Sequence, residues 1–241
     1  MNISSRLHLK KWNFYLKDEE DFLDSTLREP SKESDEAILY LHGWGGDREV
    51  QSGLLDNLCD AGFYVMNFSQ RGFSPSTGKR SLGRWHIDAS TMASYLRSQG
   101  LRVWICGLST GGAMAISTMS VDKEILGGIV MSPFASLDQL FTDKPALRDR
   151  LNRIFGQLTE EDFDASDALA RLELIGSRPL IIICGDSDET IPSTHSQLLK
   201  DKAGNRAVLK SFSGGNHVLS TVPPSELSQV VTDWIAETDR S

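Results

Sequence analysis

From residue 37 onward, short apolar runs alternate with stretches whose apolar residues recur at helical spacing. Strands that alternate with helices need right-handed crossover connections, and these produce a parallel sheet covered by helices on both faces. At 241 residues, 39% of them hydrophobic, the chain can bury a large core. We therefore expect residues 1–241 to form a single α/β domain. Its strands are expected at 37–41, 64–68, 103–106, 126–131, 180–184 and 207–212.

Two regions add to this pattern. Alternating residues at 7–16 and an apolar run at 22–27, separated by acidic residues, predict an antiparallel hairpin that brings the sheet to eight strands, most of them parallel. Between Pro133 and the strand at 180–184, a helix at 165–174 would complete the crossover, yet 134–164 carries further apolar residues at helical spacing. Such a segment forms either a small lid over a site or an amphipathic helix packed on the body, and spacing alone does not decide between them.

The charge and composition limit the partners. A formal net charge of −8 disfavours nucleic acid and anionic membranes, because a polyanion would meet a repulsive field. No apolar run approaches the roughly 20 residues that span a bilayer, so we expect no integral membrane segment. The first residues do not form the apolar block of a signal peptide, and the three cysteines lie in strand or helix patterns without metal-ligand spacing. These features predict a cytoplasmic protein with reduced, packed thiols.

A candidate nucleophile lies at the end of the strand at 103–106. Gly107-Leu108-Ser109-Thr110-Gly111 follows that strand and continues into a helical pattern, which is the context of a nucleophile elbow. The glycines allow a sharp turn that holds the Ser109 hydroxyl at the carboxyl edge of the sheet. The pattern therefore predicts that Ser109 is a catalytic nucleophile.

A serine nucleophile needs a general base and a group that orients the base. After the strand at 180–184 comes a loop with two candidate carboxylates, Asp186 and Asp188, and Asp186 could instead cap its own loop. After the last strand, a glycine-rich loop brings His217 to the same edge of the sheet. The chain order Ser, Asp, His is the order of α/β-hydrolases and not of the two main serine protease classes.

A glycine-flanked turn at 42–46 follows the first strand of the parallel series. Such a turn leaves backbone N–H groups unpaired, as an oxyanion hole requires. We expect the N–H groups of Trp44 and Thr110 to form this hole, with His42 as a structural donor in the turn.

The chain resembles the α/β-hydrolase-fold serine hydrolases, in particular the lysophospholipase, carboxylesterase and aminopeptidase-like group. The resemblance implies that the acid is Asp188, at the fourth position of a G-x-x-D-x-x-[VI]-P pattern. The chain departs from the commoner pattern at Asn216, where glycine often precedes the base, and in the short segment after Pro133. The motifs that carry the resemblance span nearly the whole chain: His42-Gly43-Trp44-Gly45, Arg71-Gly72-Phe73-Ser74, Gly107-Leu108-Ser109-Thr110-Gly111, 185–192 and Gly215-Asn216-His217.

Other residues admit both a functional and a structural interpretation. Trp44 and Trp85 could line a substrate pocket or pack in the core. Lys79, Arg80 and Arg84, with Arg71 nearby, could receive an anionic leaving group or form a solvated loop. No two histidines have metal-ligand spacing, and no cofactor is implied.

The sequence thus predicts a serine hydrolase that cleaves a small or lipid-like carboxylic ester through an acyl-enzyme on Ser109. A thioesterase and an aminoacyl amide or peptide hydrolase use the same chemistry and remain alternatives. A third alternative is a non-catalytic binding protein on a hydrolase scaffold.

Overall fold

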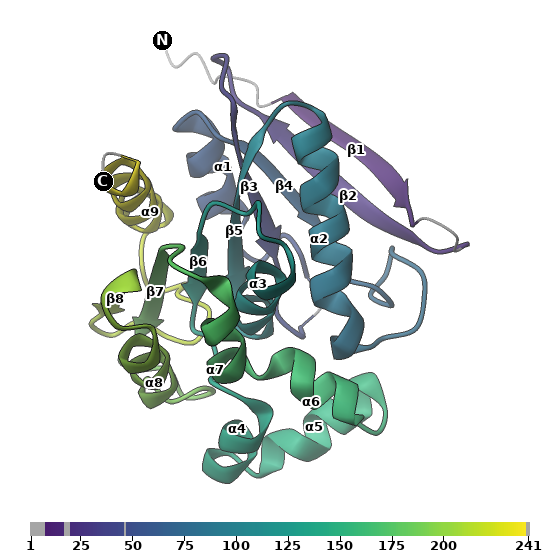
Figure 1. Cartoon of the computed structure of the whole chain (residues 1–241), viewed down its shortest axis with the longest axis vertical. Helices are drawn as coiled ribbons and strands as arrows, with labels where there is room; N and C mark the ends of the chain where they lie inside the picture. The colour runs from purple at the N-terminus through teal and green to yellow at the C-terminus, as the bar shows by residue number, and fades with distance from the viewer. Residues whose placement is uncertain (1–7, 17–19, 46, 240–241) are drawn as a thin grey trace.

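The computed structural model describes residues 8–16, 20–45 and 47–239. Eight strands form one sheet in the order β1-β2-β4-β3-β5-β6-β7-β8, and the pairs from β4 to β8 are all parallel (Figure 1). The predicted α/β-hydrolase fold is therefore confirmed. The strands are β1 His8–Tyr15, β2 Phe22–Glu29, β3 Glu36–Leu41, β4 Tyr64–Phe68, β5 Arg102–Leu108, β6 Gly128–Met131, β7 Leu180–Gly185 and β8 Ala207–Phe212.

The predicted N-terminal hairpin is present. β1 pairs antiparallel with β2, and β2 joins the rest of the sheet by antiparallel pairing with β4. Part of the acidic turn, residues 17–19, lies outside the described residues. The hairpin therefore lies at one end of the sheet, away from the strands that carry the candidate site residues.

Helices cover both faces of the sheet (Figure 1). In β3, Ile38 and Tyr40 pack into the core with α1 and α9, whereas Leu39 and Leu41 pack into the core with α2 and α3. Because both faces of the central sheet are buried, β3, β5, β6 and β7 carry continuous apolar runs instead of alternating polar and apolar residues. The helices on the two faces are α1 Ser52–Asp60, α2 Leu82–Ser98, α3 Thr110–Val121, α8 Thr194–Ala203 and α9 Pro224–Thr238. In α8, Leu199 is buried in the core, whereas Leu198 is exposed.

Residues 134–164 form helices beside the carboxyl edge of the sheet: α4 Leu137–Asp143, α5 Ala146–Phe155 and the first part of α6 Glu160–Ser166. The helix expected at 165–174 is broken, because Asp167 leaves the helical conformation and caps α7 Ala168–Arg171 by accepting the N–H of Ala170. A short 3-10 helix, Leu172–Ile175, then leads to β7.

Two predictions from composition can be compared with the structure. Cys59, Cys106 and Cys184 are free and buried, as expected for packed thiols. Within the described part of the chain, none of the helices combines the length and the apolar character that crossing a bilayer requires.

Candidate active site

Ser109 lies at the sharp turn between β5 and α3. Its backbone φ is 57° and its ψ is −120°, a left-handed conformation that costs a residue with a side chain about 1–3 kcal/mol. The turn is tight because Gly107 and Gly111 touch: a Cβ on Gly107 would lie 2.1 Å from the Gly111 carbonyl oxygen. The N–H of Ser109 donates to the Met131 carbonyl at 2.7 Å, which ties the turn to β6. The glycines of the motif therefore have the mechanical role that the sequence predicts.

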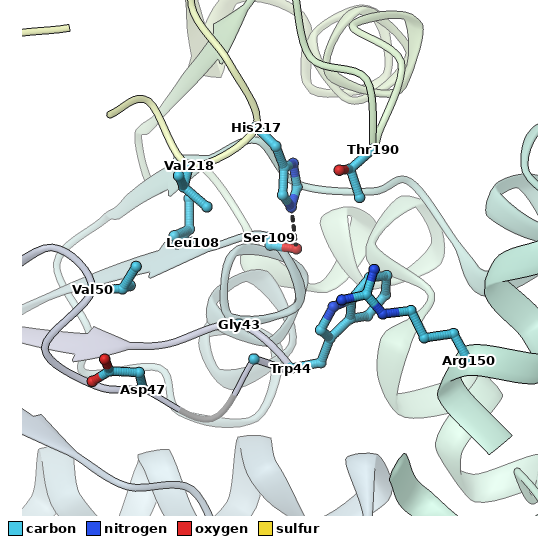
Figure 2. Close-up of a pocket in the computed structure, with 11 residues that line it drawn as sticks. Gly43, Trp44, Asp47, Val50, Leu108, Ser109, Arg150, Thr190, His217 and Val218 are labelled. Atoms are coloured by element: carbon cyan, nitrogen blue, oxygen red, sulfur yellow. Dashed lines mark hydrogen bonds between the residues drawn. The ribbon is translucent and has the colours of Figure 1, made fainter. Parts of the chain in front are cut away.

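The structure brings together the three side chains predicted from separate loops. His217 Nε2 lies 3.0 Å from Ser109 Oγ, and His217 Nδ1 lies 2.8 Å from Asp188 Oδ2 (Figure 2). Because the carboxylate can only accept, Nδ1 carries the proton, and Nε2 is free to accept the serine hydroxyl proton. Ser109, Asp188 and His217 come from the ends of β5, β7 and β8 in the parallel sheet.

Asp188 and Asp186 have different surroundings. The Asp188 side chain is 2% exposed, and its other oxygen accepts the N–H groups of Thr190 and Ile191, each at 2.8 Å. Asp186 instead accepts the N–H of Gly214 at 2.7 Å, and this bond, with that from Ser187, lowers the pKa of its carboxyl. Asp186 thus links the β7 loop to the β8 loop through Gly214, whereas the sequence had suggested that it could cap its own loop.

These two loops also touch through their backbones. A Cβ on Gly185 would lie 2.0 Å from the carbonyl oxygen of Gly215, so a residue with a side chain does not fit at Gly185. The N–H of Ser187 donates to the same Gly215 carbonyl at 3.0 Å. The distance between the acid loop and the base loop is therefore set by main-chain contact.

His42 organises the turn after β3. Its Nε2 accepts the backbone N–H of Gln70 at 2.9 Å, so Nδ1 carries the proton and donates to the Gly43 carbonyl at 2.6 Å. Burial lowers the pKa of His42 from 6.5 to about 4, which keeps the ring neutral and able to make both bonds. His42 is therefore a structural donor in this turn, as predicted.

The backbone N–H groups of Trp44 and Thr110 are the predicted oxyanion donors. Trp44 is in the turn after β3, and Thr110 is the first residue of α3. Among the described residues, neither N–H has a hydrogen-bond partner, although Thr110 is buried and Trp44 is nearly so. A buried donor without a partner costs about 1–3 kcal/mol, so such groups call for an explanation. Their use as an oxyanion hole stays a prediction.

A cavity of about 310 Å³ opens at Ser109 and His217 (Figure 2). Trp44, Val50, Leu108 and Val218 give it an apolar lining. Its charged lining residues are Asp47 and Arg150, the latter on α5. Among the described residues, no cluster of three or more His, Cys, Asp or Glu side chains could hold a metal ion. The sequence patterns did not predict that the following residues line this cavity: Asp47, Val50, Arg150, Thr190 and Val218.

Two candidates from the sequence do not belong to this cavity. Trp85 is fully buried and packs edge-to-face against His42, Phe73 and Phe155, so its core interpretation is the right one. The basic residues line a separate cavity of about 330 Å³, in which carboxylates offset their charge; it includes Arg71, Lys79, Arg80, Arg84, Asp21, Glu161 and Asp162.

Arg71 in particular is already paired. It forms two hydrogen bonds with the buried carboxylate of Asp88, at 2.8 and 2.9 Å, and a longer one with Asp21. Arg80 donates to the carbonyls of Gly72 and Ile154. Arg71 and Arg80 thus both have structural partners within the protein.

Residues 32–166, more than half of the chain, match the model of the Hydrolase_4 family, described as serine aminopeptidase S33. The chain belongs to this family. Curated relatives of this Hydrolase_4 member include YfhR of Escherichia coli K12, 25% identical over 194 residues, and human ABHD12B, 28% identical over 185 residues. These alignments cover 78% and 70% of this chain, but only 65% of YfhR and 50% of ABHD12B.

Solved structures show the same fold over nearly the whole chain. The esterase Pf2001 of Pyrococcus furiosus superposes with a TM-score of 0.79 at 20% identity, covering 96% of this chain and 91% of its own. Est1E of Butyrivibrio proteoclasticus, with ferulic acid bound, gives 0.70 at 16% identity, with coverages of 92% and 97%. A bacterial membrane phospholipase A gives 0.71 at 16% identity, with coverages of 97% and 87%. At sequence identities of 16–20%, the structural similarity establishes the fold alone.

Proposed function

We propose that this Hydrolase_4 member is a serine hydrolase that cleaves a carboxylic ester through an acyl-enzyme on Ser109. The observation that carries the proposal is the chain of two hydrogen bonds that joins Asp188 to His217 at 2.8 Å and His217 to Ser109 at 3.0 Å. A serine hydroxyl becomes an effective nucleophile at neutral pH when a positioned base accepts its proton. The family match supports a serine hydrolase, and the structural neighbours include an esterase, Pf2001.

The proposed reaction has two halves. Ser109 Oγ attacks the ester carbonyl while its proton moves to His217 Nε2, and Asp188 holds the imidazolium in place. The ester C–O bond then breaks, and the imidazolium returns the proton to the departing alkoxide oxygen. In the second half a water molecule gives its proton to His217 and attacks the acyl carbon, which releases the carboxylic acid and restores the Ser109 hydroxyl.

The negative charge on the carbonyl oxygen requires donors that are already in place. We assign this role to the N–H groups of Trp44 and Thr110. Neither N–H has another hydrogen-bond partner in the described part of the chain, and both residues are buried, which supports the assignment. One oxyanion-hole donor contributes about 10²- to 10³-fold to kcat in enzymes of this kind.

We also propose that 134–164 forms a small cap that closes one side of the cavity within a single-domain protein. α5 supplies Arg150 to the cavity lining, and its Phe155 packs against Phe73 and Trp85 of the body. The segment thus combines features of the two alternatives that its sequence allowed.

A second candidate function is hydrolysis of an aminoacyl amide or peptide. The family description names a serine aminopeptidase, and the carboxylate of Asp47 in the cavity lining could bind a free α-amino group. The shared acyl-enzyme chemistry does not distinguish this substrate from an ester.

Steady-state kinetics on matched substrates would test the proposal. We expect 4-nitrophenyl butyrate to be hydrolysed with higher kcat/KM than alanine 4-nitroanilide, and Ser109→Ala to lose ester turnover almost completely. A butyryl thioester measured in parallel separates a thioesterase from an esterase. Preference for the anilide would favour the second function, and full ester turnover by Ser109→Ala would refute both.

A further inference from the structure

The cavity at Ser109 has a positive group at one side. Arg150 projects from α5 into the lining, and its guanidinium carbon lies 5.8 Å from the centre of the Trp44 ring (Figure 2). The indole of Trp44 belongs to the same turn that provides the candidate oxyanion donor. A guanidinium stacked near an aromatic face keeps its N–H groups available at its edge, because the face itself makes the ring contact.

The charge of Arg150 is not neutralised by an ion pair. Within the described part of the chain, Arg150 has no carboxylate partner, whereas Arg171 farther along the chain pairs with Asp164. A protein with a formal charge of −8 has ample carboxylates for such pairing. An unpaired cation at the wall of a largely apolar cavity therefore favours a negatively charged ligand.

The opposite side of the cavity carries the opposite charge. Figure 2 shows Asp47 and Arg150 on opposite sides of Ser109, and Val50 and Leu108 line the cavity as well. An anionic ligand group would be repelled by Asp47 and attracted by Arg150, so the charges favour one orientation of the ligand. One guanidinium matches the two oxygens of a carboxylate, and the negative charge of Asp47 across the cavity repels a dianionic phosphate more strongly than a carboxylate.

We propose that Arg150 determines specificity by binding a carboxylate of the ester substrate, while the ester carbonyl reacts at Ser109. This inference rests on the proposed esterase function. It defines the substrate class as small esters that carry a carboxylate on either their acyl part or their alcohol part. Arg150 contacts the substrate in this account but takes no part in proton transfer.

Two pairs of esters test this inference. For the acyl part, we would compare mono-4-nitrophenyl succinate with 4-nitrophenyl butyrate; for the alcohol part, 4-acetoxybenzoate with phenyl acetate. We expect Arg150→Gln to lower kcat/KM about tenfold for the carboxylated ester of at least one pair, the size of one charge-assisted hydrogen bond. The neutral esters should change by less than about threefold, because they make no such bond.

Arg148 offers a matched control on the same helix. Its guanidinium lies near the ring of Phe141, 5.3 Å from the ring centre, and it is not among the residues that line the cavity at Ser109. Arg148→Gln removes the same charge from α5, so a general change in protein charge would affect both variants equally. Arg150→Lys should restore part of the preference for the carboxylated ester.

The results separate this inference from the function on which it rests. If the wild-type protein hydrolyses the neutral esters but Arg150→Gln leaves both carboxylated-to-neutral ratios unchanged, the role of Arg150 is refuted and the esterase function stands. An equal fall in these ratios for Arg148→Gln would also refute it. If the wild-type protein hydrolyses none of the four esters, the esterase function and the inference fail together.

Discussion

The loops at the carboxyl edge of the sheet and the helix α5 are built in different ways. The loops touch through main-chain atoms, with no room for a Cβ between Gly185 and Gly215 or between Gly107 and Gly111. Helix α5 buries Leu151 and Phe155 and leaves most of its other side chains exposed. The edge therefore fixes the distances that the proposed reaction requires, whereas α5 presents side chains that can change without altering those distances.

The two regions are nevertheless joined. Phe155 of α5 packs against Phe73 and Trp85, and both of these rings also contact His42. A second connection runs from the end of α4, where Lys144 donates to the carbonyl of Glu189 in the acid loop at 2.9 Å. The following predictions test whether substitutions at the edge and in the cap have separable effects.

The largest expected effect is at the acid loop. Asp188→Asn should lower kcat about 10⁴-fold, because an amide cannot hold His217 in the tautomer that accepts the serine proton. Asp186→Asn should stay within about threefold of the wild-type protein, because its remaining oxygen can still accept the N–H of Gly214. Steady-state ester hydrolysis measures both variants. If kcat falls to a similar extent in both variants, the two carboxylates contribute equally to the arrangement of the loops, and Asp188 has no special role in orienting His217.

A smaller effect is expected where the cap contacts the body. Phe155→Ala should lower the free energy of unfolding by about 3 kcal/mol, since it leaves a space among buried aromatic rings. Leu147→Ala, at a half-buried position on the same helix, should cost about 1 kcal/mol. Urea denaturation checks both values. Equal losses of unfolding free energy in the two variants would show that Phe155 does not hold α5 against the body more strongly than Leu147 does.

The smallest effect concerns the pH dependence of stability. The pKa of His42 is lowered from 6.5 to about 4 in the folded protein, so the unfolded chain binds more protons between these values. Stability contributed by neutral His42 is therefore present above pH 6.5 and is lost as the pH falls. Between pH 7.5 and pH 5 this loss amounts to about 2 kcal/mol.

His42→Asn removes the titrating group and should reduce the fall in unfolding free energy between these two pH values by that amount. Burial also lowers the pKa of His86 to about 4, but that residue is present in both proteins, so its contribution cancels in the difference. Urea denaturation at both pH values gives the comparison. Identical falls in the two proteins would contradict a buried, neutral His42.

The sequence predicts the site residues at the carboxyl edge of the sheet better than it predicts the cavity-lining residue of the segment 134–164, for a physical reason. Ser109 and His217 follow strands and lie two residues from glycines, and the carboxyl ends of parallel strands meet at one edge, so local signals were enough to predict their proximity. Arg150 has no such signal, because an exposed arginine on an amphipathic helix looks the same whether it faces solvent or a cavity. Its position depends on how α5 docks through Phe155, which is a tertiary contact.

The same limit explains the other differences. Lys79 and Arg80 are close in sequence to Arg71, yet the carboxylates that surround them come from elements distant in the chain, such as Asp162 in α6. Trp85 has helical neighbours in sequence, and only the docking of Phe155 and Phe73 shows that it is core. Asp167, which breaks the expected helix, is a different case: its side chain caps the N–H of Ala170 three residues later, a local signal that the spacing of apolar residues does not register.

Covalent labelling of the folded protein tests the central claim most directly. Wild-type protein would be treated with a fluorophosphonate, and the adduct located by peptide mass mapping. We expect one adduct per chain, on Ser109, formed far more slowly in His217→Ala and in Asp188→Asn and abolished in Ser109→Ala. An adduct on another residue, or equally fast labelling of Ser109 without His217, would contradict the account.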